Sequence, residues 1–129
     1  MRIPGALRQA ILKHVLACLP EEACGLVGGD GKEARRVIAV ENELHSPTQF
    51  RMRGLDQLRA FQSLDAEGLE LAAIFHSHPA GPEVPSATDL DEFNYPGVLT
   101  LIWSPRDGTW EMRAFMIEGK AAREVLVEE

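Results

Sequence analysis

The sequence is poor in cysteine. Cys18 and Cys24 are the only two in 129 residues, too few for the disulfide framework of a small secreted domain or for a structural zinc site of spaced cysteines. The start of the chain does not read as an export signal, because Lys13 and His14 interrupt its apolar stretch. We therefore expect a protein of the reducing cytoplasm.

Long apolar runs and an excess of basic charge are also absent. No stretch of about 18 apolar residues occurs, so the sequence predicts neither a membrane-spanning helix nor a membrane partner. Lys and Arg number 13 against 20 Asp and Glu, a formal net charge of −7. Such a chain lacks the basic surface needed for non-specific binding of nucleic acid, and no nucleic-acid partner is expected.

What is present is an ordinary globular composition, with 45% hydrophobic and 26% charged residues, at a length that suits one domain over residues 1–129. Periodicity and turn residues predict interleaved helices and strands, hence an α/β fold with a single mixed sheet flanked by helices. The expected helices are 5–19, 55–66 and a short one after Ser86; the expected strands are 24–29, 34–40, 70–76, 98–103, 109–117 and 122–127, with a candidate short strand at 49–52. In the second helix, one stripe is expected to be core: Leu55, Leu58, Phe61 and Leu64.

Two histidines mark the end of the strand expected at 70–76. His76 and His78 are two residues apart, so on extended backbone both side chains point to the same side. Pro79 cannot donate to a sheet ladder and ends the strand where the histidines emerge. Alone, such a pair is more often just two ordinary strand-end histidines, but two converging imidazoles can also hold one metal ion.

A serine and an aspartate follow at the spacing of a helix start. By itself, the pattern of Ser86 and Asp89 indicates a capping box. If Ser86 caps a helix, Asp89 lies on the same side and can face the histidines, whereas Asp91 is turned away. Two histidines, one carboxylate and an open position make a catalytic-type zinc site, whose bound water has a pKa lowered to about 7. A general base must lie beside that water, and Glu21 and Glu22 are both candidates.

The order of these residues resembles the JAMM (MPN-plus) zinc metalloproteases. That family's pattern is a distant Glu, then H-[ST]-H, seven residues, Ser, two residues and Asp. Residues 76–89, HSHPAGPEVPSATD, fit it without a gap, and residues 20–29, PEEACGLVGG, look like the family's segment around its glutamate. Asn42 and Phe50 stand where small bacterial members commonly carry Asn and Phe. The resemblance covers about the whole chain and implies the JAB/MPN fold, a cytidine-deaminase-like α/β/α sandwich.

The resemblance also implies a role for each matched residue. The metal would be one Zn²⁺ per chain, held by His76, His78 and Asp89. Of the two candidate bases, the match assigns Glu22. Ser86 would hydrogen-bond the oxyanion that forms during amide hydrolysis, which is compatible with capping, since a capping serine can still donate its hydroxyl. Ser77 is expected to orient the site, because no base is placed to activate it.

The implied activity is that of a zinc-dependent isopeptidase or peptidase. It would hydrolyse an amide bond at the C-terminal tail of a ubiquitin-like modifier or of a sulfur-carrier protein. Phe50, Arg51 and Met52 form a segment to which an extended tail can add as a strand, although a plain edge strand is the alternative. Removing modifiers from lysines and trimming a residue such as cysteine from a sulfur carrier both remain compatible with the sequence. A free-standing prokaryotic enzyme is expected; the oligomeric state is left open.

Two rival functions fit parts of the pattern. Metal-free relatives of the family are inactive scaffolds, but they typically lack one or more ligands and this chain lacks none. The RadC-type branch, associated with DNA repair, carries a similar block of histidines, proline, serine and aspartate. The acidic net charge and the PEEACG segment argue against that branch.

Overall fold

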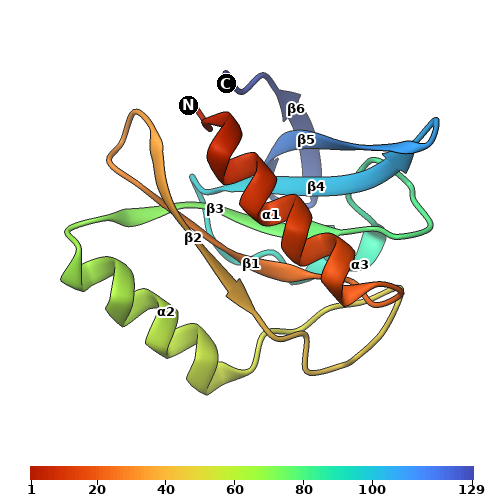
Figure 1. Ribbon diagram of the computed structural model, residues 1–129, viewed down its shortest axis with the longest axis horizontal. Helices are drawn as coiled ribbons and strands as arrows, with labels where there is room; N and C mark the ends of the chain where they lie inside the picture. The colour runs from red at the N-terminus through yellow and green to blue at the C-terminus, as the bar shows by residue number, and fades with distance from the viewer.

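The computed structural model describes residues 1–129 and contains three helices and six strands (Figure 1). The helices are α1 (Gly5–Cys18), α2 (Gly54–Ala66) and α3 (Ala87–Glu92). The strands are β1 (Cys24–Gly29), β2 (Ala34–Val40), β3 (Glu70–Ser77), β4 (Leu99–Arg106), β5 (Thr109–Glu118) and β6 (Ala121–Val125). The candidate strand at 49–52 is reduced to a single bridge between Met52 and Asn42.

All six strands form one sheet, in the order β2-β1-β3-β4-β5-β6. Neighbouring strands are antiparallel except for β3 and β4, which run parallel and are joined by the segment that carries α3. Because β1 is antiparallel to β3, the first residues of β1 lie beside the last residues of β3. This pairing sets the place of the candidate site.

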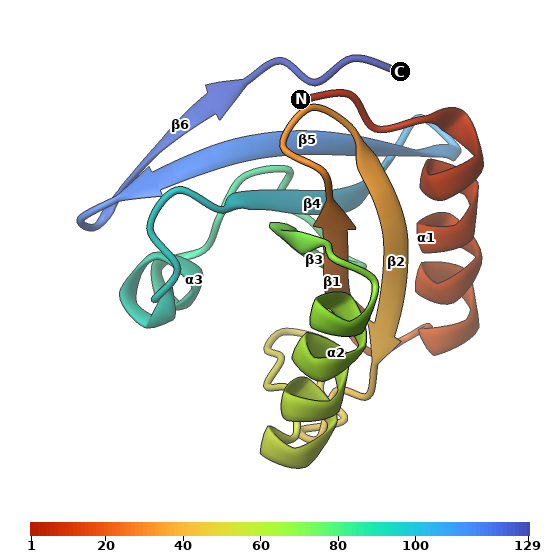
Figure 2. The same ribbon diagram turned by 90° about the vertical axis from the view of Figure 1, so that its left-hand side faces the viewer.

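Helices cover both faces of the sheet, with α1 on one side and α2 and α3 on the other (Figure 2). The larger apolar core lies under α1, where Ile11 and Val15 pack with Phe75 and Trp103 of the sheet. A smaller cluster lies on the opposite face, where Ala60 of α2 packs with strand residues. The single-domain mixed α/β architecture expected from the sequence is thus observed.

Helix α2 approaches the sheet closely at a glycine. A Cβ added to Gly28 would lie 2.4 Å from Leu64 Cδ2, so the missing side chain makes room for this leucine. Leu64 and Ala60 are the buried residues of α2. The helix therefore packs through the face that carries these two residues.

The expected core stripe of α2 is wrong at its first two positions, since Leu55 and Leu58 are each 52% exposed. Steps of three residues fall about 60° short of a full helical turn, so a run spaced only by threes winds around the helix. Leu64 lies at one end of that spiral and faces the sheet, and the early leucines face solvent.

Neither cysteine forms a disulfide; Cys18 is partly exposed and Cys24 is buried. No helix of the chain combines the length and the apolar character that crossing a membrane requires.

Candidate metal centre

Strand pairing brings three separate segments together at one end of the sheet. Cys24, at the start of β1, lies opposite His76 in β3, so Glu22 just before β1 reaches the histidine pair. Past the end of β3, the His78 amide donates to the Trp103 carbonyl of β4 over 2.8 Å. The returning segment then places α3, with Asp89 in its first turn, against both histidines.

The side chains of His76, His78 and Asp89 meet in one small cluster. The two Nε2 atoms are 3.1 Å apart, and Asp89 Oδ2 lies 3.1 Å from that of His76 and 3.0 Å from that of His78. Ligands at 2.0–2.1 Å from a tetrahedral metal ion stand about 3.3 Å from one another. The triangle therefore has nearly the size that such an ion requires, and its two nitrogens and one oxygen are donors that zinc accepts.

The tautomer of His78 also suits a metal ligand. Its Nδ1 lies 2.8 Å from the Pro82 carbonyl oxygen, which can only accept, so Nδ1 carries the proton and donates. The Nε2 atom of the neutral ring then presents a lone pair to the cluster. A cation held by the three side chains would offset the repulsion between this lone pair and the Asp89 carboxylate.

Asp89 is held in place by the start of α3. Ser86 and Asp89 form a complete capping box: the Asp89 amide donates to Ser86 Oγ over 3.0 Å, and the Ser86 amide donates to Asp89 Oδ2 over 2.8 Å. Burial acts to raise the pKa of Asp89, but the two imidazoles and the Ser86 amide hold it well below its usual range. As expected, Asp91 points elsewhere, and it pairs with Lys120.

The two histidines respond in opposite directions to this environment. Burial lowers the pKa of His76 despite its contact with Asp89. Burial also acts to lower the pKa of His78, but Asp89, the Pro82 carbonyl and Glu22 together raise it. A neutral imidazole is the form that binds metal, and His76 is held in that form by its surroundings.

Of the two candidate bases, only Glu22 faces the cluster. Its side chain is 2% exposed, and a carboxylate oxygen of Glu22 lies within 4.8 Å of ligand nitrogens of His76 and His78. Its buried Oε1 atom has no hydrogen-bond partner. Burial raises the pKa of Glu22 to about 8, so this carboxyl group is poised to exchange a proton near neutral pH.

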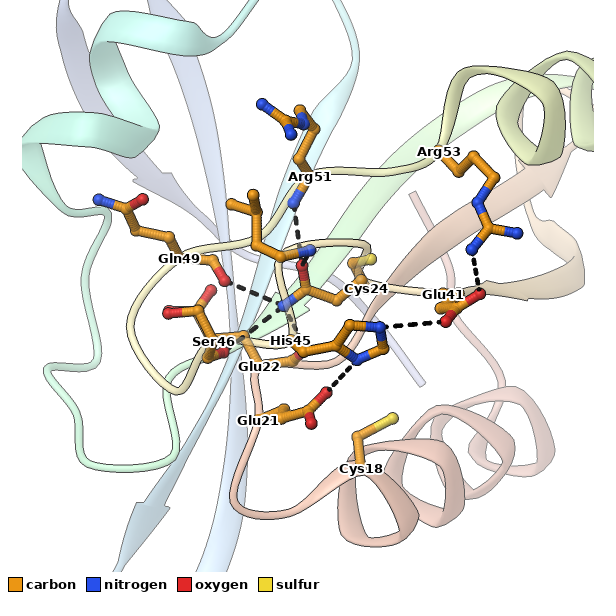
Figure 3. Close-up of polar contacts among 12 residues, drawn as sticks. Cys18, Glu21, Glu22, Cys24, Glu41, His45, Ser46, Gln49, Arg51 and Arg53 are labelled. Atoms are coloured by element: carbon orange, nitrogen blue, oxygen red, sulfur yellow. Dashed lines mark hydrogen bonds and ion pairs between the residues drawn. The ribbon is translucent and has the colours of Figure 1, made fainter.

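Glu21 points to the surface instead. Its Oε1 lies 3.0 Å from His45 Nδ1, and His45 also contacts Glu41 (Figure 3). Glu21 lies in the bend that follows α1, where its amide donates to the Cys18 carbonyl over 2.9 Å, whereas Glu22 lies on the approach to β1. Sequence spacing alone left both open, because their distance from the histidine pair depends on how β1 and β3 pair.

Asn42 is a buried junction that connects Glu22 to the loop 43–51. Its Nδ2 donates to the Glu22 carbonyl over 3.1 Å and to the Gln49 carbonyl over 2.9 Å, and its Oδ1 accepts from the Arg51 amide at 3.1 Å. The resemblance pointed to Asn42 without a role. Its hydrogen bonds show what it does: it fixes the loop that carries Phe50 relative to the segment that carries Glu22.

A cavity of about 200 Å³ opens directly beside the cluster, with His76 and Asp89 in its wall. The three residues named from the sequence as substrate-binding all line it: Phe50, Arg51 and Met52. Two further lining residues had no signal in the sequence. Tyr95 accepts a hydrogen bond from Gln57 of α2 over 2.7 Å, and buried Thr100 has a hydroxyl without a partner. An extended chain in this cavity would reach the candidate metal ligands.

Comparisons with known proteins show the family to which the chain belongs. Residues 4–118 match the sequence model of a family described as prokaryotic homologues of the JAB domain. A desampylase from Pyrococcus furiosus is 34% identical over 118 residues, which cover 92% of this chain and 81% of that protein. A CysO-cysteine peptidase from Mycobacterium tuberculosis is 31% identical over 121 residues, which cover 92% of this chain and 83% of that protein.

A solved structure shares the overall fold. A protein from Desulfitobacterium hafniense superposes with a TM-score of 0.87 at 32% identity, covering 99% of this chain and 93% of its own. The resemblance to the JAMM family drawn from the motif is confirmed, and a JAB1/MPN domain protein from Archaeoglobus fulgidus, at a TM-score of 0.68 and 22% identity over 99% of this chain, shows the expected fold. The chain is therefore a JAMM-type peptidase and belongs to the prokaryotic branch of the JAB family.

Proposed function

We propose that this protein is a zinc-dependent isopeptidase or peptidase that cuts an amide bond at the C-terminal tail of a ubiquitin-like modifier or a sulfur-carrier protein. The observation that carries the proposal is the triangle formed by His76, His78 and Asp89, with the unpartnered Glu22 carboxyl group beside it. The relatives named as a desampylase and as a CysO-cysteine peptidase support both substrate classes.

The three side chains of the triangle would hold one Zn²⁺ per chain. Zinc with three protein ligands supplies an open position for water and lowers the pKa of that water to about 7. Asp89 contributes a carboxylate whose lowered pKa keeps it ionised. His78 is oriented by the Pro82 carbonyl, which fixes the direction in which its Nε2 points.

Glu22 would move the proton during hydrolysis. Its carboxyl group would take a proton from the attacking water and pass it to the nitrogen of the leaving amine. A pKa near the working pH favours both halves of this transfer, because the group must accept a proton and then release it. The hydrogen bonds of Asn42 and Ser46 to the backbone of Glu22 keep the carboxyl group in reach of the cluster.

Ser86 would stabilise the developing charge on the substrate carbonyl oxygen. Ser86 Oγ accepts a hydrogen bond from the Asp89 amide, which leaves the hydroxyl proton free to donate. A donor aimed at this oxygen contributes most when it is already oriented before the reaction. The capping box supplies that orientation, so one side chain would serve the helix and the reaction together.

The cavity lined by Phe50, Arg51 and Met52 would receive the tail. Both main-chain polar groups of Arg51 are engaged, the amide by Asn42 and the carbonyl by the Glu43 amide. The main-chain groups of Phe50 and Met52 would therefore pair with an extended peptide, which gives affinity independent of side chains. A tail that ends in glycines fits this manner of binding, because it can lie close to the strand without steric conflict. Two unpaired thiols suit a reducing compartment, so we propose a cytoplasmic location. We also propose that residues 1–129 form a single domain.

Zinc-loaded protein incubated with two substrates tests the proposal. One is a protein joined to a ubiquitin-like modifier through a lysine; the other is a sulfur-carrier protein extended by a C-terminal cysteine. We expect at least one of the two substrates to be cut at the amide bond that follows the C-terminal tail of the modifier or carrier. Glu22→Gln should retain zinc and lose a factor of about 10²–10⁴ in kcat, whereas the matched surface variant Glu21→Gln should remain active. Cleavage of neither substrate, or full activity of Glu22→Gln, would overturn it.

A further inference from the structure

The two candidate histidine ligands are oriented by different means. Histidines that bind a metal through one ring nitrogen almost always donate the other N–H to a carbonyl, a carboxylate or water, which fixes the ring. His78 follows this rule through its 2.8 Å bond to the Pro82 carbonyl. His76 does not: its Nδ1 is buried and has no hydrogen-bond partner.

An aromatic ring lies against His76 instead. The rings of Phe50 and His76 are stacked, with centroids 4.5 Å apart and planes inclined by 24°. This is the spacing of an attractive offset aromatic pair. Rotation about the last side-chain torsion of a histidine has only broad preferences of its own. The neighbours of His76 therefore decide where its Nε2 points.

The position of Phe50 is itself well determined. Its two sequence neighbours are both bonded to Asn42, through the Gln49 carbonyl and the Arg51 amide. Asn42 is 5% exposed and also bonds to the Glu22 carbonyl. The hydrogen bonds of Asn42 thus fix the backbone on both sides of Phe50 and the backbone of Glu22 together.

From this asymmetry we infer that Phe50 is a positioning residue for the metal ligand His76, taking the place of the absent Nδ1 hydrogen bond. The inference rests on the metal centre proposed above and deepens it. Phe50 binds no metal. Its ring holds the His76 ring in the orientation that places His76 Nε2 beside His78 Nε2 and Asp89 Oδ2. The same ring also lines the cavity beside the cluster, so substrate and metal ligand contact one side chain.

Three variants separate stacking from simple filling of space. Phe50→Leu keeps an apolar side chain but removes the ring, Phe50→Tyr restores a ring, and Met52→Leu alters the same loop and cavity away from the stack. Metal affinity is measured by competition with a chelator, first for zinc. The absorption spectrum of the Co²⁺-loaded protein then reports ligand geometry, and thermal unfolding of the metal-free protein reports the fold.

We expect Phe50→Leu to weaken zinc binding by about 10-fold or more, the range seen when groups that orient metal ligands are removed, and to alter the Co²⁺ spectrum. Phe50→Tyr and Met52→Leu should keep the affinity and spectrum of the wild type. Should Phe50→Leu unfold, Phe50→Met serves in its place, with the same expectation.

Three results overturn the inference. Phe50→Leu binding zinc as the wild type does would show that stacking is dispensable. Phe50→Tyr failing as badly as Phe50→Leu would show that the ring is not the feature that matters. Wild-type protein that binds no zinc would remove the metal centre itself, and with it this role of Phe50. Zinc binding with no cleavage of any tail would instead contradict the proposed substrates and leave the role of Phe50 standing.

Discussion

Ala23 and Ser77 are joined by a reciprocal pair of hydrogen bonds. The Ala23 amide donates to Ser77 Oγ over 2.8 Å, and the Ser77 amide donates to the Ala23 carbonyl over 3.0 Å. Each residue is next to a candidate functional group, Glu22 in one segment and the two histidines in the other. The serine between the histidines therefore fixes the base-carrying segment against the ligand-carrying segment, which agrees with the orienting role expected for it.

Replacing Ser77 with alanine should destabilise the protein. Ser77 is fully buried, so the variant would leave the Ala23 amide without its acceptor, at a cost of about 1–3 kcal/mol. Urea unfolding of the metal-free protein measures this difference. Ser63→Ala, at a serine of α2 without a side-chain hydrogen bond, is the control and should change little. Equal stability of Ser77→Ala and wild type would contradict the account.

The stability of the metal-free protein should depend on pH through Glu22. Its pKa rises from an ordinary 4.5 to about 8 on folding, so the folded state holds a proton that the unfolded state releases. The contribution of this group is complete below pH 4.5 and is lost as pH rises through 8. Glu22→Gln removes that loss. In the presence of a chelator, the variant should match wild type near pH 5 and exceed it above pH 8, by on the order of 4 kcal/mol. A difference that stays constant with pH would show that Glu22 is not held as described.

Asn42→Ala should loosen the loop 43–51. The change leaves the Arg51 and Leu44 amides without their acceptor and removes the donors to the Glu22 and Gln49 carbonyls. We expect a stability loss of about 2–3 kcal/mol and faster hydrogen exchange at the Leu44 and Arg51 amides. Amides of β4 report on the rest of the fold and should keep their protection. Unchanged exchange in the loop would contradict the role given to Asn42.

Ser86→Ala should separate metal binding from turnover. Loss of the hydroxyl donor should lower kcat by about 10²-fold. Loss of the α3 cap should lower the free energy of unfolding by about 1 kcal/mol. The zinc content should stay the same. Ser86→Thr keeps a hydroxyl in the same role and should restore most of the activity. Zinc loss in Ser86→Ala would assign the serine to holding Asp89 in place, and an unchanged kcat would remove it from the reaction.

Much of this protein could be predicted from local patterns. The HSH spacing, the proline that follows and the Ser86–Asp89 pair are short-range features, and strand alternation and helix capping convert them directly into geometry. The pairing of the two histidines and the capping box follow from them, whereas the contact of Asp89 with the histidines also depends on the loop that returns α3 to the sheet. The helices and strands were predictable for the same reason, since each depends on its own periodicity.

The remainder depends on contacts between distant segments. Glu22 rather than Glu21 faces the cluster because β1 pairs with β3 in one particular register, which no local pattern specifies. Leu55 and Leu58 face solvent because α2 packs on the sheet with Leu64 against Gly28. The stacking of Phe50 on His76 and the missing Nδ1 partner of His76 depend on the loop that Asn42 ties down. These features required the folded chain.

The proposed metal centre is tested by the zinc content per chain of untagged protein, measured beside that of a His76→Ala/His78→Ala double variant. Asp91→Asn, which alters an acid of α3 that pairs with Lys120 away from the cluster, is the matched control. We expect one zinc in the wild type and in Asp91→Asn, and none in the double variant. No zinc in the wild type after reconstitution at neutral pH, or the same content in the double variant, would contradict this expectation.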